Sequence, residues 1–204
     1  QQKITEILTT IDEAIEKTDA IIEKNKRIKQ GLMQDLFRYG IDEYGNIRSE
    51  KTHKFKTVKI GNEVMRIPED WEVKNMEQIY SEPIRDFGSF SSTKQIEFID
   101  DGVLFIKSEQ IAEGRLDLTN KYFISERVHK LLKKSFVKKG NILFSKIGSA
   151  LGKALVYDGS HGMCNSNAAV AKIQVDDKKA DNYYIMYFLN YQDTQDRLKS
   201  LIIS

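Results

Sequence analysis

Apolar side chains recur every three or four residues along the first 37 positions of the chain, and the other positions there are mostly polar or charged. This spacing is the heptad pattern of an amphipathic helix that packs against another helix. We therefore predict one long helix over residues 1–37, a rod of about 50 Å at about 1.5 Å rise per residue. A third heptad position is also apolar, which makes the stripe three positions wide. Its large aliphatic members are Ile4, Ile7, Leu8, Ile11, Ile15, Ile21, Ile22, Ile28, Leu32 and Leu36.

The stripe needs a surface to cover it, because a single helix cannot bury one face on itself. The helix either lies on its own domain or pairs with a partner helix, and its length favours a partner, since the mean globular helix has only about 11–12 residues. Thr18, Asn25 and Lys29 interrupt the stripe and are typical of positions that fix helix register. The residues that we expect at the helix–helix interface are Ile4, Leu8, Ile11, Ile15, Ile22 and Leu32.

The pattern changes twice after the helix. Residues 38–57 contain Gly40, Gly45 and Asn46 and are typical of a linker with a turn. From residue 58 onward, short runs with β-strand character predict strands at Val64–Ile67, Trp71–Met76, Val103–Lys107, Asn141–Ser145, Ala154–Tyr157 and Ala168–Val175. Two helices are expected among them, Glu126–Lys134 capped by Ser125 and Asn182–Leu201 capped by Asp181. The prediction is an α+β chain with a coiled-coil helix at 1–37, a linker at 38–57 and a mixed α/β domain at 58–204.

Composition and charge narrow the class of function. The chain carries 32 Lys and Arg against 30 Asp and Glu, so its net charge of +2 excludes a strongly basic, purely electrostatic nucleic-acid binder. Five lysines nevertheless fall within residues 130–139, either as a solvated helix face or as a rim that contacts DNA phosphates. The single cysteine, Cys164, excludes an internal disulfide and is typical of a reducing cytoplasm, where we expect the chain to lie. No apolar run approaches the roughly 18 residues of a membrane span.

Catalytic signatures are weak throughout the chain. The glycines of Gly148–Lys153 are spaced too closely for a phosphate loop, and Ala154 replaces the hydroxyl residue that would hold magnesium. His161 and Cys164 have no second ligand pair with which to form a zinc site. Asp70, Glu72 and Lys74 resemble a nuclease motif, but all three lie within five residues at one predicted strand, whereas the first carboxylate of that motif should come from a separate strand. The chain has no Pro-Pro pair, which a methyltransferase loop requires. We therefore expect no enzyme, no cofactor and no metal site.

Three segments together resemble the specificity subunit of type I restriction–modification enzymes. The helix, with Ile11-Asp-Glu-Ala-Ile15 and Leu32-Met-Gln-Asp-Leu-Phe37, is similar to a conserved spacer helix of that family. Ile67-Pro-Glu-Asp-Trp-Glu-Val73 is similar to the opening of its target recognition domain. The later β-rich core of that domain is similar to Gly140–Ser149, Gly152-Lys153-Ala154 and Asn165-Ser-Asn-Ala168. Each motif alone is weakly specific, whereas their order spans nearly the whole chain.

The resemblance implies a subunit without catalytic activity. Such a subunit has two target recognition domains, which read the two halves of a split DNA target, and two spacer helices that pack antiparallel between them. It binds methyltransferase subunits, and motor-nuclease subunits join for cleavage. With one helix and one domain, this chain corresponds to about half of that subunit, as a fragment or a half-subunit. The partner of its helix would then be the second spacer helix of the missing half or the helix of a homodimer mate.

Contacts to double-stranded DNA are expected on polar loops of the domain. Glycines in the loop after residue 145 allow a close approach of the backbone, and lysine and asparagine side chains can contact phosphates or base edges. The candidate DNA-binding residues are Arg85, Ser92, Lys94, Lys146, Ser149, Lys153, Asn165 and Asn167. The alternative function is a coiled-coil scaffold that does not bind DNA. The long helix alone would support that alternative.

Overall fold

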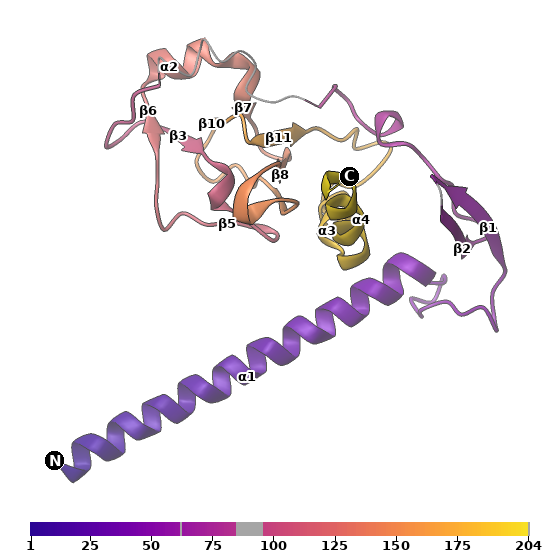
Figure 1. Cartoon of the computed structure of the whole chain (residues 1–204), viewed down its shortest axis with the longest axis horizontal. Coiled ribbons are helices and arrows are strands. Elements are labelled where there is room, and N and C mark those ends of the chain that lie inside the picture. Colours follow the sequence, from indigo (N-terminus) through magenta and orange to yellow (C-terminus); the bar gives the residue numbers. More distant parts are fainter. Residues whose placement is uncertain (62, 85–95, 204) are drawn as a thin grey trace. The chain divides into compact units, whose positions relative to one another are not determined.

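The computed structural model describes residues 1–61, 63–84 and 96–203, and the chain forms two compact units, Gln1–Glu72 and Val73–Ser204. Each unit is described by itself (Figure 1). The first unit consists of a long helix and a β-hairpin, and the second is a mixed domain of strands and helices. The predicted fold class, a long N-terminal helix followed by a mixed α/β domain, is confirmed.

Helix α1 (Gln2–Tyr39) is a rod of 38 residues, as the heptad pattern predicted. It ends at Gly40, which adopts φ 69° and ψ −169°, a conformation that essentially only glycine populates. The backbone N–H of Gly40 donates to the carbonyl of Leu36 at 3.0 Å and so closes the last turn. No residue of α1 is buried, and every large aliphatic side chain of the stripe is exposed, from 64% at Ile4 to 40% at Leu36.

A β-hairpin follows, formed by the antiparallel strands β1 (Phe55–Ile60) and β2 (Glu63–Pro68). The segment between α1 and the hairpin is more ordered than a simple linker, because Ile41 and Ile47 form a β-bridge around a turn held by Asp42. The compact units divide after Glu72, so the hairpin groups with the helix. The expected start of the recognition domain at residue 58 is a functional boundary and stays a prediction.

Two contacts fasten the end of α1 to the chain that follows β2. The indole of Trp71 covers Gly40 so closely that a Cβ at residue 40 would lie 2.6 Å from its ring. The guanidinium of Arg48 donates to both carboxylate oxygens of Asp70, at 2.5 and 3.0 Å, and to the carbonyl of Ile41 at 2.8 Å. Hydrogen bonding to Arg48 lowers the pKa of Asp70. Trp71–Met76 is therefore no strand. That prediction is wrong because the indole of Trp71 packs against Gly40 at the end of α1.

The second unit contains two larger sheets and a short hairpin. The four-stranded sheet has the order β6-β3-β10-β7, with β6 (Phe123–Ile124), β3 (Val103–Ile106), β10 (Cys164–Ser166) and β7 (Phe136–Val137). The three-stranded antiparallel sheet has the order β11-β8-β9, with β11 (Val170–Ile173), β8 (Ile142–Ser145) and β9 (Ala154–Val156). The short hairpin pairs β4 (Ile111–Ala112) with β5 (Arg115–Leu116). In β10, Asn165 and Ser166 pair in parallel with Phe105 and Ile106 of β3.

The core of the second unit consists of three clusters of buried side chains. Buried side chains of both larger sheets meet in one cluster that includes Ile106, Val137, Leu143 and Val170. The opposite face of the three-stranded sheet packs on α3 (Asn182–Asn190) through Ile142, Ile173, Ile185 and Met186. Phe105, Ile124, Val128 and Leu132 join the four-stranded sheet to α2 (Glu126–Leu131). The two sheets therefore lie between α2 on one side and α3 on the other, and Figure 1 shows α3 and α4 beside β8 and β11.

The helices of this unit largely follow the predicted caps. Ser125 Oγ accepts from the N–H of Val128 at 3.3 Å, and Asp181 Oδ1 accepts from the N–H of Tyr184 at 2.8 Å. The single helix expected over Asn182–Leu201 is instead two helices, α3 and α4 (Gln192–Ile203), because Tyr191 adopts an extended conformation. Short 3₁₀ helices lie at Met76–Gln78, Ser108–Gln110, Lys133–Ser135 and Gly148–Ala150. Among the described residues, no helix is long and apolar enough to cross a bilayer.

The contact between Gly40 and Trp71 can be tested by a pair of Gly→Ala substitutions. At Gly40 the new Cβ would clash with Trp71 in a backbone conformation closed to alanine, and we expect a loss of at least about 1–3 kcal/mol. At Gly31, inside α1, a Cβ meets nothing within 4 Å, and alanine should stabilise the helix by about 1 kcal/mol. Urea unfolding followed by the fluorescence of Trp71 measures both. Equal effects of the two substitutions would contradict a stabilising contact between Gly40 and Trp71.

Candidate nucleic-acid interface

The loop that follows β8 holds three of the predicted DNA-binding residues. It leaves the sheet at Ser145 and returns at Lys153, where the N–H of Ser145 donates to the carbonyl of Lys153 at 3.0 Å. Between them, Gly148–Ala150 form a 3₁₀ turn, and Gly148 adopts φ +71° with open space around it. Ser149 and Lys153 are exposed, and Lys146 is partly buried. The loop is thus a polar, accessible segment held by backbone hydrogen bonds.

The Lys146 side of this loop faces α4. Lys146 lines a hollow of about 200 Å³ together with Phe144, Leu151, Leu198 and Lys199. Gln195 of α4 donates to the carbonyl of Gly152 at 2.7 Å and so fixes the end of the loop to the helix. This surface is largely apolar, with two lysines at its edge.

The structure contradicts the predicted DNA-binding role of Asn165. Its side chain is fully buried, and its amide Nδ2 donates to the carbonyl of Leu132 at 3.0 Å and to Ser135 Oγ at 2.8 Å. Its Oδ1 lies 2.5 Å from His129 Nδ1, which must carry the proton because Oδ1 can only accept. All polar atoms of this amide are used inside the domain, so Asn165 is a core residue and cannot reach a base.

The other predicted residues differ in their surroundings. Asn167 is partly buried, and its Oδ1 accepts from the N–H of Ala169 at 3.2 Å in a local turn. It lies at the end of the three-stranded sheet where Lys146 also lies, since the N–H of Lys146 donates to the carbonyl of Ala169 at 2.8 Å. Arg85, Ser92 and Lys94 lie outside the described residues. The DNA-binding roles of Lys146, Ser149, Lys153 and Asn167 stay predictions.

A second basic surface gathers at the other end of β8. Lys133, Lys134, Lys138 and Lys172 line one hollow of about 230 Å³, which we call the lysine hollow. Its other lining residues are Glu82, Phe136, Asn141 and Gln174. Three of the four lysines belong to the cluster at 130–139 that the sequence singled out. Lys172 was missed, although its position as the one charged residue in the run Val170–Ile173 was a usable signal.

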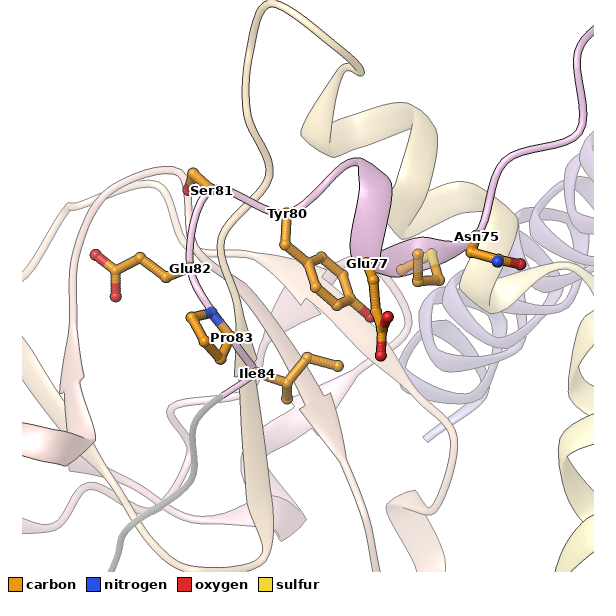
Figure 2. A pocket seen from close by; sticks show the side chains of 8 residues that line it. Asn75, Glu77, Tyr80, Ser81, Glu82, Pro83 and Ile84 are labelled. Carbon is orange, nitrogen blue, oxygen red and sulfur yellow. The ribbon is translucent and has the colours of Figure 1, made fainter.

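Another hollow of the second unit has a different character. It measures about 800 Å³ and is lined by residues between Asn75 and Ile84. Figure 2 shows the ring of Tyr80 beside the carboxylate of Glu77, with Pro83 and Ile84 further along the chain. Burial, and after it the charge of Glu77, raises the pKa of Tyr80. With Glu77 and Glu82 and no cation in its lining, this hollow is unsuited to phosphate.

Cys164 is a core thiol. The hydroxyl of Tyr157 lies 2.9 Å from Cys164 Sγ and donates to the carbonyl of Gly162 at 2.9 Å. Burial raises the pKa of both groups, so both stay protonated at neutral pH. Among the residues described, no group of three His, Cys, Asp or Glu side chains is arranged to hold a metal ion.

Comparison with known proteins identifies the chain's relatives. No family model matches the chain. The type I restriction enzyme MjaVIII specificity subunit of Methanocaldococcus jannaschii is 28% identical over 145 residues, which are 71% of this chain and 30% of that subunit. The MjaX specificity subunit of the same organism is 27% identical over 143 residues, 69% of this chain and 32% of that subunit. The chain thus spans about a third of the length of these relatives. Its similarity to type I restriction enzyme specificity subunits agrees with the resemblance of its motifs.

Two solved structures also align with the chain. One is the HsdS subunit of Thermoanaerobacter tengcongensis, with a TM-score of 0.49 and 15% identity over 90% of this chain and 39% of that one. The other comes from work on the assembly and conformational transition of a type I R-M system, with a TM-score of 0.46 and 13% identity over 93% of this chain and 40% of that one.

The role of Asn165 can be tested against that of Asn167. Asn165→Ala would remove three side-chain hydrogen bonds, and we expect a loss of about 2–3 kcal/mol in unfolding free energy. His129 Nδ1 would lose its acceptor, while Ser135 Oγ would still donate to the Leu132 carbonyl. Asn167→Ala removes one partly exposed hydrogen bond and should cost about 1 kcal/mol or less. Urea unfolding measures both. A stable Asn165→Ala variant that fails only in DNA binding would contradict the core assignment.

Proposed function

We propose that this chain is the non-catalytic DNA-recognition half of a type I restriction–modification specificity subunit. The observation that carries the proposal is its homology to two specificity subunits over about 70% of its length. In this role the domain reads one half of a bipartite duplex target, and methyltransferase and motor-nuclease subunits are directed to that target. The lysine-rich surface supports the proposal, because its ammonium groups offer donors for DNA phosphates.

The helix gives the second part of the proposal. Its stripe of ten large aliphatic side chains is exposed at 40% or more, which is far more apolar surface than a helix keeps in water without a partner. We therefore propose that α1 packs against a second spacer helix, from a missing half-subunit or from a homodimer mate. Thr18 and Asn25 in the stripe would then set the register of the pair.

Selection from a random duplex pool tests DNA recognition. The chain, with the methyltransferase subunits that it is proposed to bind, should enrich a short common sequence that shifts in a gel. A scaffold protein would enrich none, since it has no groups that distinguish bases. Absence of enrichment together with normal helix pairing would therefore favour the alternative function, a coiled-coil interaction module.

The helix interface can be tested by charge insertion. Ile11→Asp with Ile15→Asp places two carboxylates in the seam, which should cost several kcal/mol and abolish association. The matched control, Thr9→Asp with Ala20→Asp, adds the same charge on the opposite face and should leave association intact. Light scattering and circular dichroism at several concentrations measure mass and helicity. If both pairs of substitutions behave alike, the stripe is not the interface.

The absence of catalysis is also testable. We expect the chain alone to transfer no methyl group from S-adenosylmethionine to DNA and to cut no duplex in the presence of magnesium and ATP. Incorporation of labelled methyl groups into DNA, and gel analysis of plasmid integrity, provide the measurements. Methyl transfer that persists in the purified chain would contradict the proposal.

A further inference from the structure

Four lysines converge on the lysine hollow from three different parts of the second unit. Lys133 and Lys134 come from the 3₁₀ helix after α2, Lys138 from the turn between β7 and β8, and Lys172 from β11. The segment 130–139 holds five lysines and no carboxylate, in a chain whose overall charge is only +2. Positive charge is therefore concentrated here, at one edge of the gap between the two sheets.

Three of the four lysines of the hollow have no ion-pair partner among the described residues. Within the described part of the chain, no salt bridge joins Lys133, Lys134 or Lys138 to a carboxylate. Glu82 is the one carboxylate in the lining, against four lysines. Like charges held close together repel one another, and an anion that enters the hollow relieves that repulsion. A volume of about 230 Å³ holds several groups of the size of water, each of which takes about 30 Å³.

The backbone that carries these lysines is fixed in advance. The buried amide of Asn165 holds the Leu132 carbonyl and Ser135, on either side of Lys133 and Lys134. Lys172 Nζ donates to the carbonyl of Phe136 at 2.7 Å, and Asn141 Oδ1 accepts from the N–H of Lys138 at 2.8 Å. Binding an anion therefore requires little reordering of the backbone, which favours affinity.

The lysine hollow and Lys146 lie on opposite faces of the same sheet. Lys172 pairs with Leu143, and Ala171 pairs with Phe144, so Lys172 and Leu143 share one face while Phe144 points to the other. Phe144 lines the hollow of Lys146 on the α4 side. The two basic surfaces also flank opposite ends of β8. One straight duplex cannot lie against both faces, so a choice between them is required.

We propose that the lysine hollow holds backbone phosphates of the DNA duplex, and that the face it occupies, rather than the α4 side around Lys146, is the DNA-facing side of the domain. This inference rests on the proposed function, DNA recognition, and specifies the surface that performs it. Lysine ammonium groups act as point charges toward phosphate, so the hollow supplies affinity and register but no sequence preference.

The test compares three double substitutions that remove the same charge. The hollow variant, Lys133→Gln with Lys138→Gln, removes two charges from the hollow. The loop variant, Lys146→Gln with Lys153→Gln, removes two charges from the loop after β8. The control variant, Lys121→Gln with Lys178→Gln, removes two charges from exposed lysines elsewhere. Fluorescence anisotropy with a random-sequence duplex, across a salt series, gives the slope of log K against log salt for the chain bound to its methyltransferase subunits. Each lost phosphate contact lowers the magnitude of that slope by about 0.9.

We expect the hollow variant to lower the slope by about two, and the loop and control variants to change it by less than half a unit. Lys133→Arg with Lys138→Arg keeps the charge and should keep the slope, which separates charge from any effect on folding. A drop in slope for the loop variant alone would overturn this inference and leave DNA recognition intact. Tighter binding of the chain to single-stranded DNA than to duplex DNA would also overturn this inference. Failure of the unmodified chain to bind any duplex would instead overturn the proposed function.

Discussion

The amide of Asn165 is the interaction on which the basic surface of the second unit depends. It lies at the centre of the four-stranded sheet, in the strand that pairs with both β3 and β7. From there it reaches the end of α2 and the 3₁₀ turn beyond it, and His129, stacked on Phe136 at 4.4 Å, completes its hydrogen bonds. A buried amide is costly unless every polar atom is paired, so this network admits one arrangement of the segment that carries the lysines.

Sheet pairing then places Lys172 on the face of the three-stranded sheet opposite to that of Phe144. Alternation along β8 and β11 directs Leu143 and Lys172 toward the gap between the sheets, whereas Ile142 and Ile173 meet α3. The same alternation explains why Lys146, which directly follows β8, does not join the lysines of the hollow. The register of two short strands therefore decides that Lys172 joins the lysines of the segment 130–139, which the net charge of the chain does not indicate.

The sequence was sufficient for features that depend on local periodicity. The heptad spacing predicted α1, short runs with β-strand character predicted β8, β9 and β11, and the side chains of Ser125 and Asp181 predicted two helix caps. It failed where a distant contact overrides local preference. Trp71 leaves the predicted strand to cover Gly40, and Asn165 was predicted to bind DNA although the fold buries it. The break of the last helix at Tyr191 was also not predicted. Polar residues in a turn-like run cannot be sorted into core and surface from sequence alone.

The bare helix has a consequence for how the chain behaves in solution. None of the residues of α1 is buried, and all ten large aliphatic side chains of its stripe are exposed. Most helical stability in proteins comes from packing of an apolar face, so the outer turns of α1 gain their order from whatever covers the stripe. Folding of this segment is therefore coupled by mass action to the concentration of the helix that covers the stripe, whereas the second unit is stabilised by a core of its own.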